Sequence, residues 1–400
     1  MSGNNLLTIS KITNEALMVL ENELTFTNNV TREYDDQFAV TGAKIGNTLN
    51  VRRPGRFIGT TGPALNVEDF NETSVPVTLS TQFHVDTQFT TQDLALSLDA
   101  FSDRILKPAV AAIANKMDYD GLTMAKNNVA NIVGTAGAYM DSEGAPRDGR
   151  RSCVIEPFTS ATIVDSLKGL FVPSDVIGKQ YTKGMMGRDS AGMNWYMDQN
   201  IVSQTFGSYS GKTLSVDTTS ASFGIATGWA QFGTVTLVAS SALTLNQGDV
   251  IQFAGVYGVN PQNRQSYGKL RNFVVMSTTA VATGGGTSVT VSPAIITGGQ
   301  FQNVVVTSTS ATAVVTPFNN TGTTSPQNLV FHKNFATLAT ADLELPDGVH
   351  FAGRASDKDL GLSIRVVRQY TINNDSIPTR LDVLYGWSPL YPELACRVAA

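Results

Sequence analysis

An amphipathic stripe from Thr91 to about Val129 constrains the fold more than any other stretch of this chain. Its apolar residues recur every three or four positions, as on one face of an α-helix, at Leu94, Leu98, Phe101, Ile105, Ala109, Ile113 and Met117. Asp93 and Asp99 fall in the early turns, where negative charge suits the partly positive helix end. The stripe predicts either an ordinary core helix or a long strut.

Pro108 lies inside this stripe. It lacks a backbone N–H and its ring presses on the carbonyl group of Arg104, so we expect a short helix, a kink and a longer helix. From Pro108 to Val129 the longer helix would extend about 30 Å, at about 1.5 Å per residue.

The residues before the stripe predict a protruding β-hairpin. Apolar and β-branched residues occupy the odd positions from Val75 to Phe89, which gives a strand one buried and one solvated face. An earlier strand stops at Pro54-Gly55, and a polar loop then runs to Thr73. The edges of such a hairpin have to be covered by another surface.

The composition changes at Phe206, and through about Ser325 charges almost disappear while Thr, Ser, Gly and Val dominate. Short apolar runs separated by turn signals occur at 235–238, 250–253, 273–276, 289–291 and 304–306. This pattern predicts an all-β barrel or sandwich of about six strands, inserted into a mixed α/β domain.

Outside this module the spacing predicts a mixed α/β organisation. We expect an amphipathic N-terminal helix around 9–20, a turn-rich segment at 134–149, and further helices at 159–171 and 332–341. We expect strands at 152–155, 193–197, 201–202, 361–370, 379–387 and 394–398.

The composition and net charge of the chain exclude several classes of protein. Charged residues are 15% of the chain and the formal net charge is -5, so a sequence-specific DNA-binding protein is not expected, although a wall beside packed DNA is compatible. No apolar run is long enough for a membrane span, and the N-terminus has no secretion-signal pattern. Cys153 and Cys396 are expected to be isolated buried thiols in a reducing compartment, with a bridge between them as the alternative.

No residue pattern predicts catalysis, a cofactor or a metal. Gly207 to Thr213 approaches a phosphate loop, but Phe206 stands where its first glycine belongs and residues 214–219 favour a strand. Asp118 and Asp120 lie two apart and face different sides of a helix, so they cannot act as a close acid/base pair. Asp118, near the expected helix end, is instead expected to tie the helix to a neighbouring loop. Arg52 and Arg53 could contact phosphate or form interface salt bridges.

The order of these elements resembles the major capsid (coat) protein of tailed double-stranded DNA phages, in the short-tailed-phage branch with an inserted β-barrel. Three stretches carry the resemblance, namely Gly46 to Pro54, Gly248 to Val256, and Phe331-His332-Lys333 together with Arg380 to Trp387. The resemblance implies an α+β capsid fold of the Hong-Kong-ninety-seven type, with an N-arm, an extended-loop hairpin, a spine helix in a peripheral domain, an axial domain and the inserted barrel.

The implied domains follow the chain in order. They are the arm at 1–40, the extended-loop hairpin and a peripheral strand at 41–90, the spine helix and peripheral domain at 91–150, the first axial part at 151–206, the barrel at 207–326 and the axial and peripheral return at 327–400.

The implied function is a non-enzymatic shell protein that self-assembles as hexamers and pentamers around the genome. The implied partners are a scaffolding protein, a portal, non-specifically packaged double-stranded DNA and a decoration protein, with assembly in the bacterial cytoplasm and no membrane. Inter-subunit contacts are expected at Lys44, Arg52, Arg53, Arg56, Glu68 and Asp69, and Pro108 is the expected hinge if the shell expands. The alternative is a β-rich phage tail, decoration or adhesion component.

Overall fold

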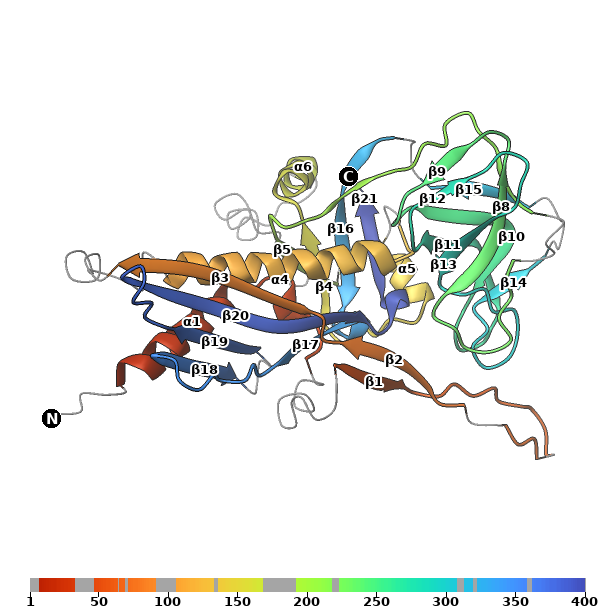
Figure 1. Cartoon of the computed structure of the whole chain (residues 1–400). Helices are drawn as coiled ribbons and strands as arrows, with labels where there is room; N and C mark the ends of the chain where they lie inside the picture. Colours follow the sequence, from red (N-terminus) through yellow and green to blue (C-terminus); the bar gives the residue numbers. More distant parts are fainter. Residues whose placement is uncertain are drawn as a thin grey trace. The chain divides into compact units, whose positions relative to one another are not determined.

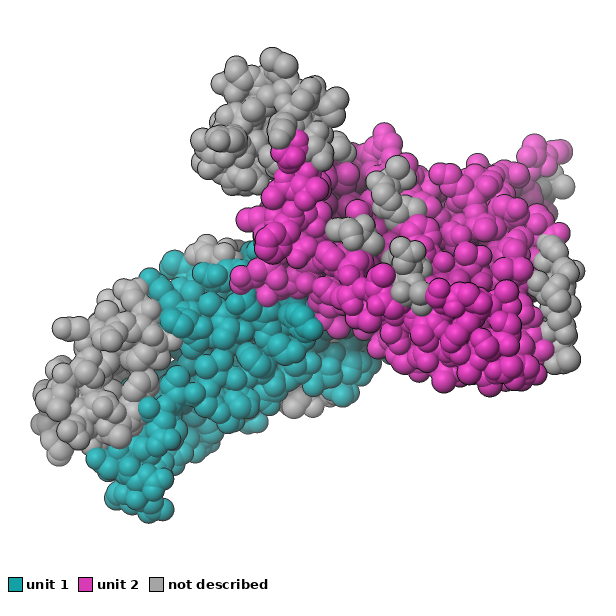
Figure 2. Space-filling view, turned by 90° about the horizontal axis from the view of Figure 1, so that it is seen from above, with its two compact units in different colours: residues 1–51, 75–121, 336–390 teal, residues 52–74, 122–335, 391–400 magenta. Residues whose placement is uncertain are grey.

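The structure is a computed structural model that describes residues 7–32, 47–63, 65–68, 71–90, 106–132, 136–167, 192–217, 223–307, 313–318, 322–357 and 362–399. The chain divides into two compact units, coloured teal and magenta in Figure 2. Unit 1 comprises residues 1–51, 75–121 and 336–390, and unit 2 comprises residues 52–74, 122–335 and 391–400.

Unit 1 is organised around the long strand β20 (Ser376–Pro389), shown in blue in Figure 1. Strand β3 (Thr81–Thr90) pairs with one edge of β20, and β17 (Ala336–Ala341) and β19 (Leu362–Arg368) pair with successive parts of the other edge. Strand β18 (Phe351–Asp357) completes this antiparallel sheet beside β19. Helix α1 (Leu7–Glu23), close to the expected arm helix, packs on β18 and β19, and the 3₁₀ turn η1 (Thr27–Asn29) follows it.

Helix α4 (Lys107–Asn128) confirms the predicted long helix over the second half of the stripe from Thr91 to Val129. Pro108 is the second residue of α4 as its bounds are described, and the residue before α4, Leu106, is also helical. The expected preceding helix, and the kink between the two, fall on 91–105, outside the described residues.

Two predictions of strands and helices are corrected in this part of the chain. The helix predicted at 332–341 is wrong, because a 3₁₀ turn η4 (Lys333–Phe335) leads into β17, whose six residues are all buried. A strand buried on both faces shows no polar alternation, so its spacing can mimic a helix. The single strand predicted from Val75 to Phe89 is two strands, since β2 (Thr73–Thr78) pairs with β1 (Thr48–Arg53) whereas β3 pairs with β20.

Unit 2 contains a second sheet, ordered β21–β16–β4–β5, from strands far apart in sequence. Its strands are β21 (Ala395–Ala399), β16 (Thr324–His332), β4 (Arg151–Ile155) and β5 (Asn194–Met197), with β6 (Ser203–Thr205) also paired to β16. Helix α6 (Pro157–Leu167) follows β4, and the 3₁₀ turn η5 (Pro392–Leu394) precedes β21. The segment expected to be turn-rich instead contains helix α5 (Ala136–Ser142), which burial of Tyr139 and Met140 stabilises although Gly137 has a low helix propensity.

Six further strands of unit 2 form a closed antiparallel barrel, as the apolar runs predicted. The order around it is β11 (Ser266–Val275), β13 (Thr287–Ser292), β8 (Gly233–Ala239), β7 (Leu214–Val216), β15 (Val314–Pro317) and β10 (Val250–Val259), closed by pairing of β10 with β11. Strand β14 (Val304–Val306) adds to β10, and β9 (Leu243–Leu245) pairs with β12 (Thr279–Val281).

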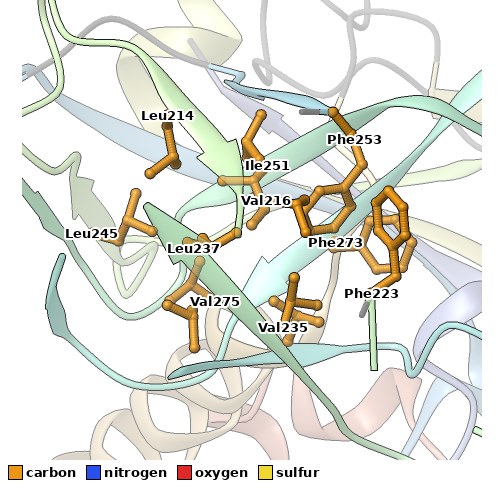
Figure 3. Packing of buried hydrophobic residues seen from close by; sticks show 14 of the residues in the cluster. Leu214, Val216, Phe223, Val235, Leu237, Leu245, Ile251, Phe253, Phe273 and Val275 are labelled. Atoms are coloured by element: carbon orange, nitrogen blue, oxygen red, sulfur yellow. The ribbon is translucent and has the colours of Figure 1, made fainter. Parts of the chain in front are cut away.

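The barrel interior is filled by aliphatic and aromatic side chains from all six of these strands (Figure 3). Within it the ring of Phe253 lies 5.2 Å from the ring of Phe273 and 5.7 Å from that of Phe223. Such close packing of large apolar groups gives the barrel a core of its own.

Candidate assembly interface

The chain between β1 and β2, residues 54–72, is here called the extended loop. Among its described residues it exposes four large apolar side chains, those of Phe57, Ile58, Leu65 and Val67. Leu65 is 90% exposed and Val67 is 77% exposed. Large apolar groups gathered in water on one segment mark a surface that another molecule covers.

Two contacts give this loop a defined conformation. The backbone N–H of Ile58 donates a hydrogen bond of 2.6 Å to Oε2 of Glu68, which connects the two limbs of the loop. Arg264, which lies between β10 and β11, donates to the carbonyl oxygen of Phe57 at 3.2 Å. The extended loop is therefore attached to the barrel near its start.

Arg53, the last residue of β1, anchors the base of the extended loop in unit 2. Its guanidinium carbon lies 4.5 Å from the ring centroid of Tyr391 and 5.5 Å from that of Trp229. Its Nη2 atom donates to Oε1 of Glu393 at 2.7 Å. A planar cation held by two aromatic rings and a carboxylate is restricted to one geometry.

Arg56 approaches the same carboxylate, with its Nη2 atom 3.5 Å from Oε1 of Glu393. Burial lowers the pKa of the Arg56 guanidinium, partly offset by Glu393. Burial by itself would raise the pKa of the Glu393 carboxyl, but Arg53 and Arg56 hold it below its usual value. Glu393 is therefore ionised at neutral pH and shared between two arginines.

A second, more deeply buried ion pair lies nearby in unit 2. Nη1 of Arg271, on β11, donates to Oε1 of Glu143 at 2.9 Å, and their side chains are only 9% and 3% exposed. The hydroxyl group of Tyr267 donates to the same Oε1 atom at 3.1 Å. Burial and the neighbouring Glu143 raise the pKa of Tyr267, so this hydroxyl stays a donor at neutral pH.

A cavity of about 210 Å³ lies between the two ion pairs. Its lining includes the residues of both ion pairs, the ring of Trp229 and polar side chains between β13 and β14. The cavity is therefore lined by three elements, namely the base of the extended loop, the barrel and the segment before β21.

Asp118 anchors the chain after helix α1 to helix α4 within unit 1, which confirms its predicted role. Its carboxylate accepts hydrogen bonds from the backbone N–H groups of Thr25, Phe26 and Thr27 and from the Thr27 hydroxyl, at 2.8, 3.2, 2.9 and 2.6 Å. One turn away, Gly121 lets the rings of Phe26 and Trp387 approach the helix, because a Cβ there would lie 2.7 Å from each.

The predicted contact residues do not form one cluster. Arg53 and Arg56 meet at Glu393, whereas Arg52 is 79% exposed and lies 3.4 Å from Glu72. Glu68 braces the extended loop. Lys44 and Asp69 fall outside the described residues.

Sequence reasoning missed the residues that surround Arg53 and Arg56, namely Glu143, Trp229, Arg271, Tyr391 and Glu393. Arg271 alone carried a signal in the sequence, because it is a charged residue inside a strand-like apolar run of a module that has few charges. Glu143, Trp229 and the segment that carries Tyr391 and Glu393 are separated by long stretches of chain, and only folding brings them together.

Within the described residues no group of three or more His, Cys, Asp or Glu side chains could hold a metal ion. A search of the same part of the chain found no helix with the length and apolar character needed to cross a membrane. Cys153 and Cys396 are buried, unbridged thiols in one apolar cluster. The chain after Gly207 to Thr213 continues as strand β7, as predicted, and not as the helix that a phosphate loop requires.

Comparisons with known proteins identify the family. The model of the P22 coat protein family (P22 coat protein, gene protein 5) matches residues 1–397. Similar solved structures include Mycobacterium phage Che8 (12% identity, 94% of this chain and 90% of that one, TM-score 0.46) and the mature capsid of bacteriophage PhiM1 (11%, 94% and 86%, 0.44). The procapsid of satellite phage P4 is also similar (8% identity, 100% of this chain and 92% of that one, TM-score 0.37). No curated protein sequence matches the chain.

The family match extends over nearly the whole chain, including the arm, the extended loop, α4 and the barrel. A β-rich tail or adhesion component does not explain such a match. The chain belongs to the P22 coat protein family and is a structural major capsid protein of the phage shell, not an enzyme.

Proposed function

We propose that this chain tiles an icosahedral shell as hexamers and pentamers, and that the extended loop contacts a neighbouring copy. The exposure of Phe57, Ile58, Leu65 and Val67 on one braced loop carries the proposal. Burying these side chains on a neighbouring copy stabilises the contact by about 25 cal/mol of association free energy for each Å² of apolar surface removed from water.

The rigid attachment of the loop supports this role. Arg53 holds its base and Glu68 braces its limbs, so little conformational entropy is lost when the loop docks. Each contact is modest, and a shell gains stability because every copy repeats it. Arg52, Glu68 and Glu72 carry charges near the apolar side chains and would orient the docked loop.

The finer layout is part of the same proposal. The capsid subunit is divided, in this proposal, into five parts. They are the arm at 1–40, the hairpin at 41–90, the spine helix and peripheral domain at 91–150, the axial parts at 151–206 and 327–400, and the inserted barrel at 207–326. The two compact units do not coincide with these boundaries. Pro108 is the proposed hinge, because a proline within a helical stretch lacks a backbone donor and its ring presses on the preceding turn, which favours bending there.

The proposed partners are a scaffolding protein, a portal, a decoration protein and packaged double-stranded DNA, with assembly in the bacterial cytoplasm. The net charge of -5 supports a wall that contacts DNA without binding it tightly. Mass spectrometry of precursor shells isolated from cells tests this set, and shells built of this chain alone would contradict the scaffold and portal assignments.

The loop contact is tested with the double variant Leu65→Asn, Val67→Thr. Both side chains are exposed within the subunit, so we expect its thermal unfolding to be unchanged while sedimentation shows slow subunits in place of shells. Val314→Thr, at an exposed position of the barrel strand β15, is the matched control and should still form shells. Normal shells from the double variant, or equal loss in the control, would refute the loop contact.

A further inference from the structure

The cavity between the two ion pairs has more cationic donors than its own carboxylates can satisfy. Three arginines, Arg53, Arg56 and Arg271, line it together with two glutamates, Glu143 and Glu393. This leaves one positive charge uncompensated among these five groups. Each guanidinium also presents five N–H donors, far more than the two carboxylates accept here.

One of these donors is buried without a partner. Arg271 is 7% exposed, and its Nη1 atom is used by Glu143 and by the carbonyl oxygen of Asn303. Its Nε atom has no hydrogen-bond partner. Because an unsatisfied buried donor is costly, this N–H is expected to be satisfied by an acceptor that the protein itself does not supply.

We propose that this cavity binds a small oxyanion of the phosphate type. The volume of about 210 Å³ exceeds the roughly 30 Å³ of a single water and lies below the range of about 300–1,000 Å³ typical of larger organic ligands. Arginine forks match the oxygens of a phosphate group with two parallel hydrogen bonds. An anion also relieves the repulsion between Arg53 and Arg56, which share Glu393.

The position of the cavity gives the bound anion a structural consequence. Arg53 and Arg56 belong to the base of the extended loop, whereas Arg271 belongs to the barrel strand β11. An oxyanion held between them joins the two elements through charge-assisted hydrogen bonds. Occupancy therefore stiffens the base of the extended loop, a property beyond the proposed shell contact.

The test is calorimetric titration of inorganic phosphate into the unassembled full-length chain at constant ionic strength. We expect one saturable site per chain. Arg56→Gln should weaken binding by at least about tenfold, which corresponds to about 1.4 kcal/mol, because one charged donor is lost. Arg271→Lys should weaken it similarly while keeping a cation beside Glu143, so folding is preserved.

Lys212→Gln is the control, since Lys212 is the lysine of the phosphate-loop-like segment and does not line the cavity. It should bind phosphate as the parent chain does. Absence of saturable binding, or affinity that the arginine variants leave unchanged, would overturn the proposal. Loss of binding in Lys212→Gln would also overturn it, by placing the anion elsewhere. None of these readouts depends on shell assembly.

Discussion

Replacing Asp118 with asparagine tests how the chain after α1 is held on helix α4. Oδ1 of Asp118 accepts from the backbone N–H and the hydroxyl of Thr27, and an amide oxygen can keep both bonds. Oδ2 accepts from the N–H groups of Thr25 and Phe26. In Asp118→Asn an NH₂ group faces these two donors, so both lose their acceptor.

The expected cost follows from burial. Asp118 is 1% exposed, and each buried donor left unsatisfied costs about 1–3 kcal/mol. Two fully buried donors would cost about 2–6 kcal/mol together, but the Thr25 N–H is only partly buried, so we expect Asp118→Asn to lower the free energy of unfolding by about 2–5 kcal/mol. Urea unfolding followed by tryptophan fluorescence reports this loss, because Trp387 packs against Phe26 with ring centroids 5.4 Å apart.

Asp120→Asn is the matched control, two residues along the same helix. Asp120 accepts from Lys116 at 2.5 Å and from the hydroxyl of Tyr385 at 2.7 Å, and an asparagine oxygen can still accept from either. Its side chain is 24% exposed, so we expect a loss below about 1 kcal/mol. If both variants lose the same stability, or Asp118→Asn loses less than about 1 kcal/mol, the carboxylate does not anchor this segment as described.

Three further predictions concern packing, charge and the hinge. Gly121→Ala should destabilise the chain by about 1–3 kcal/mol in urea unfolding, because its Cβ would meet the Phe26 and Trp387 rings, whereas Gly137→Ala in α5 has room and should be neutral or stabilising. Arg147 and Arg151 hold the pKa of Asp141 at about 2, below the usual value of 3.8, so its ion pairs stabilise the fold above about pH 4 and this contribution is lost as the pH falls toward 2. Asp141→Asn should remove that part of the pH dependence, and an unchanged profile would contradict it. Pro108→Ala should alter the precursor-to-mature transition, seen by electron microscopy, more than it alters folding, and equal loss of both would count against a hinge.

Most of the local elements and the coat protein family could be predicted from the amino-acid sequence, whereas the segments 75–89, 134–149 and 332–341 were predicted wrongly. The apolar spacing of helix α4 and the short apolar runs of the barrel strands depend on neighbouring residues, so they can be recognised without the fold. The predicted role of Asp118, to tie the helix to a neighbouring loop, is confirmed by its hydrogen bonds, although Asp118 lies in the middle of α4 and not near its end. The order of these elements along the chain then led to the coat protein family.

Which distant residues meet could be seen only in the folded chain. Arg53 and Glu393 are 340 positions apart, and no periodicity connects them. Likewise, β17 is a strand and β2 is separate from β3 because of their partners, β20 and β1, and not because of their own residues. Local spacing reports which face of an element is apolar, but pairing across the chain depends on how all the elements pack, and the ion pairs around the cavity exist only once that packing is complete.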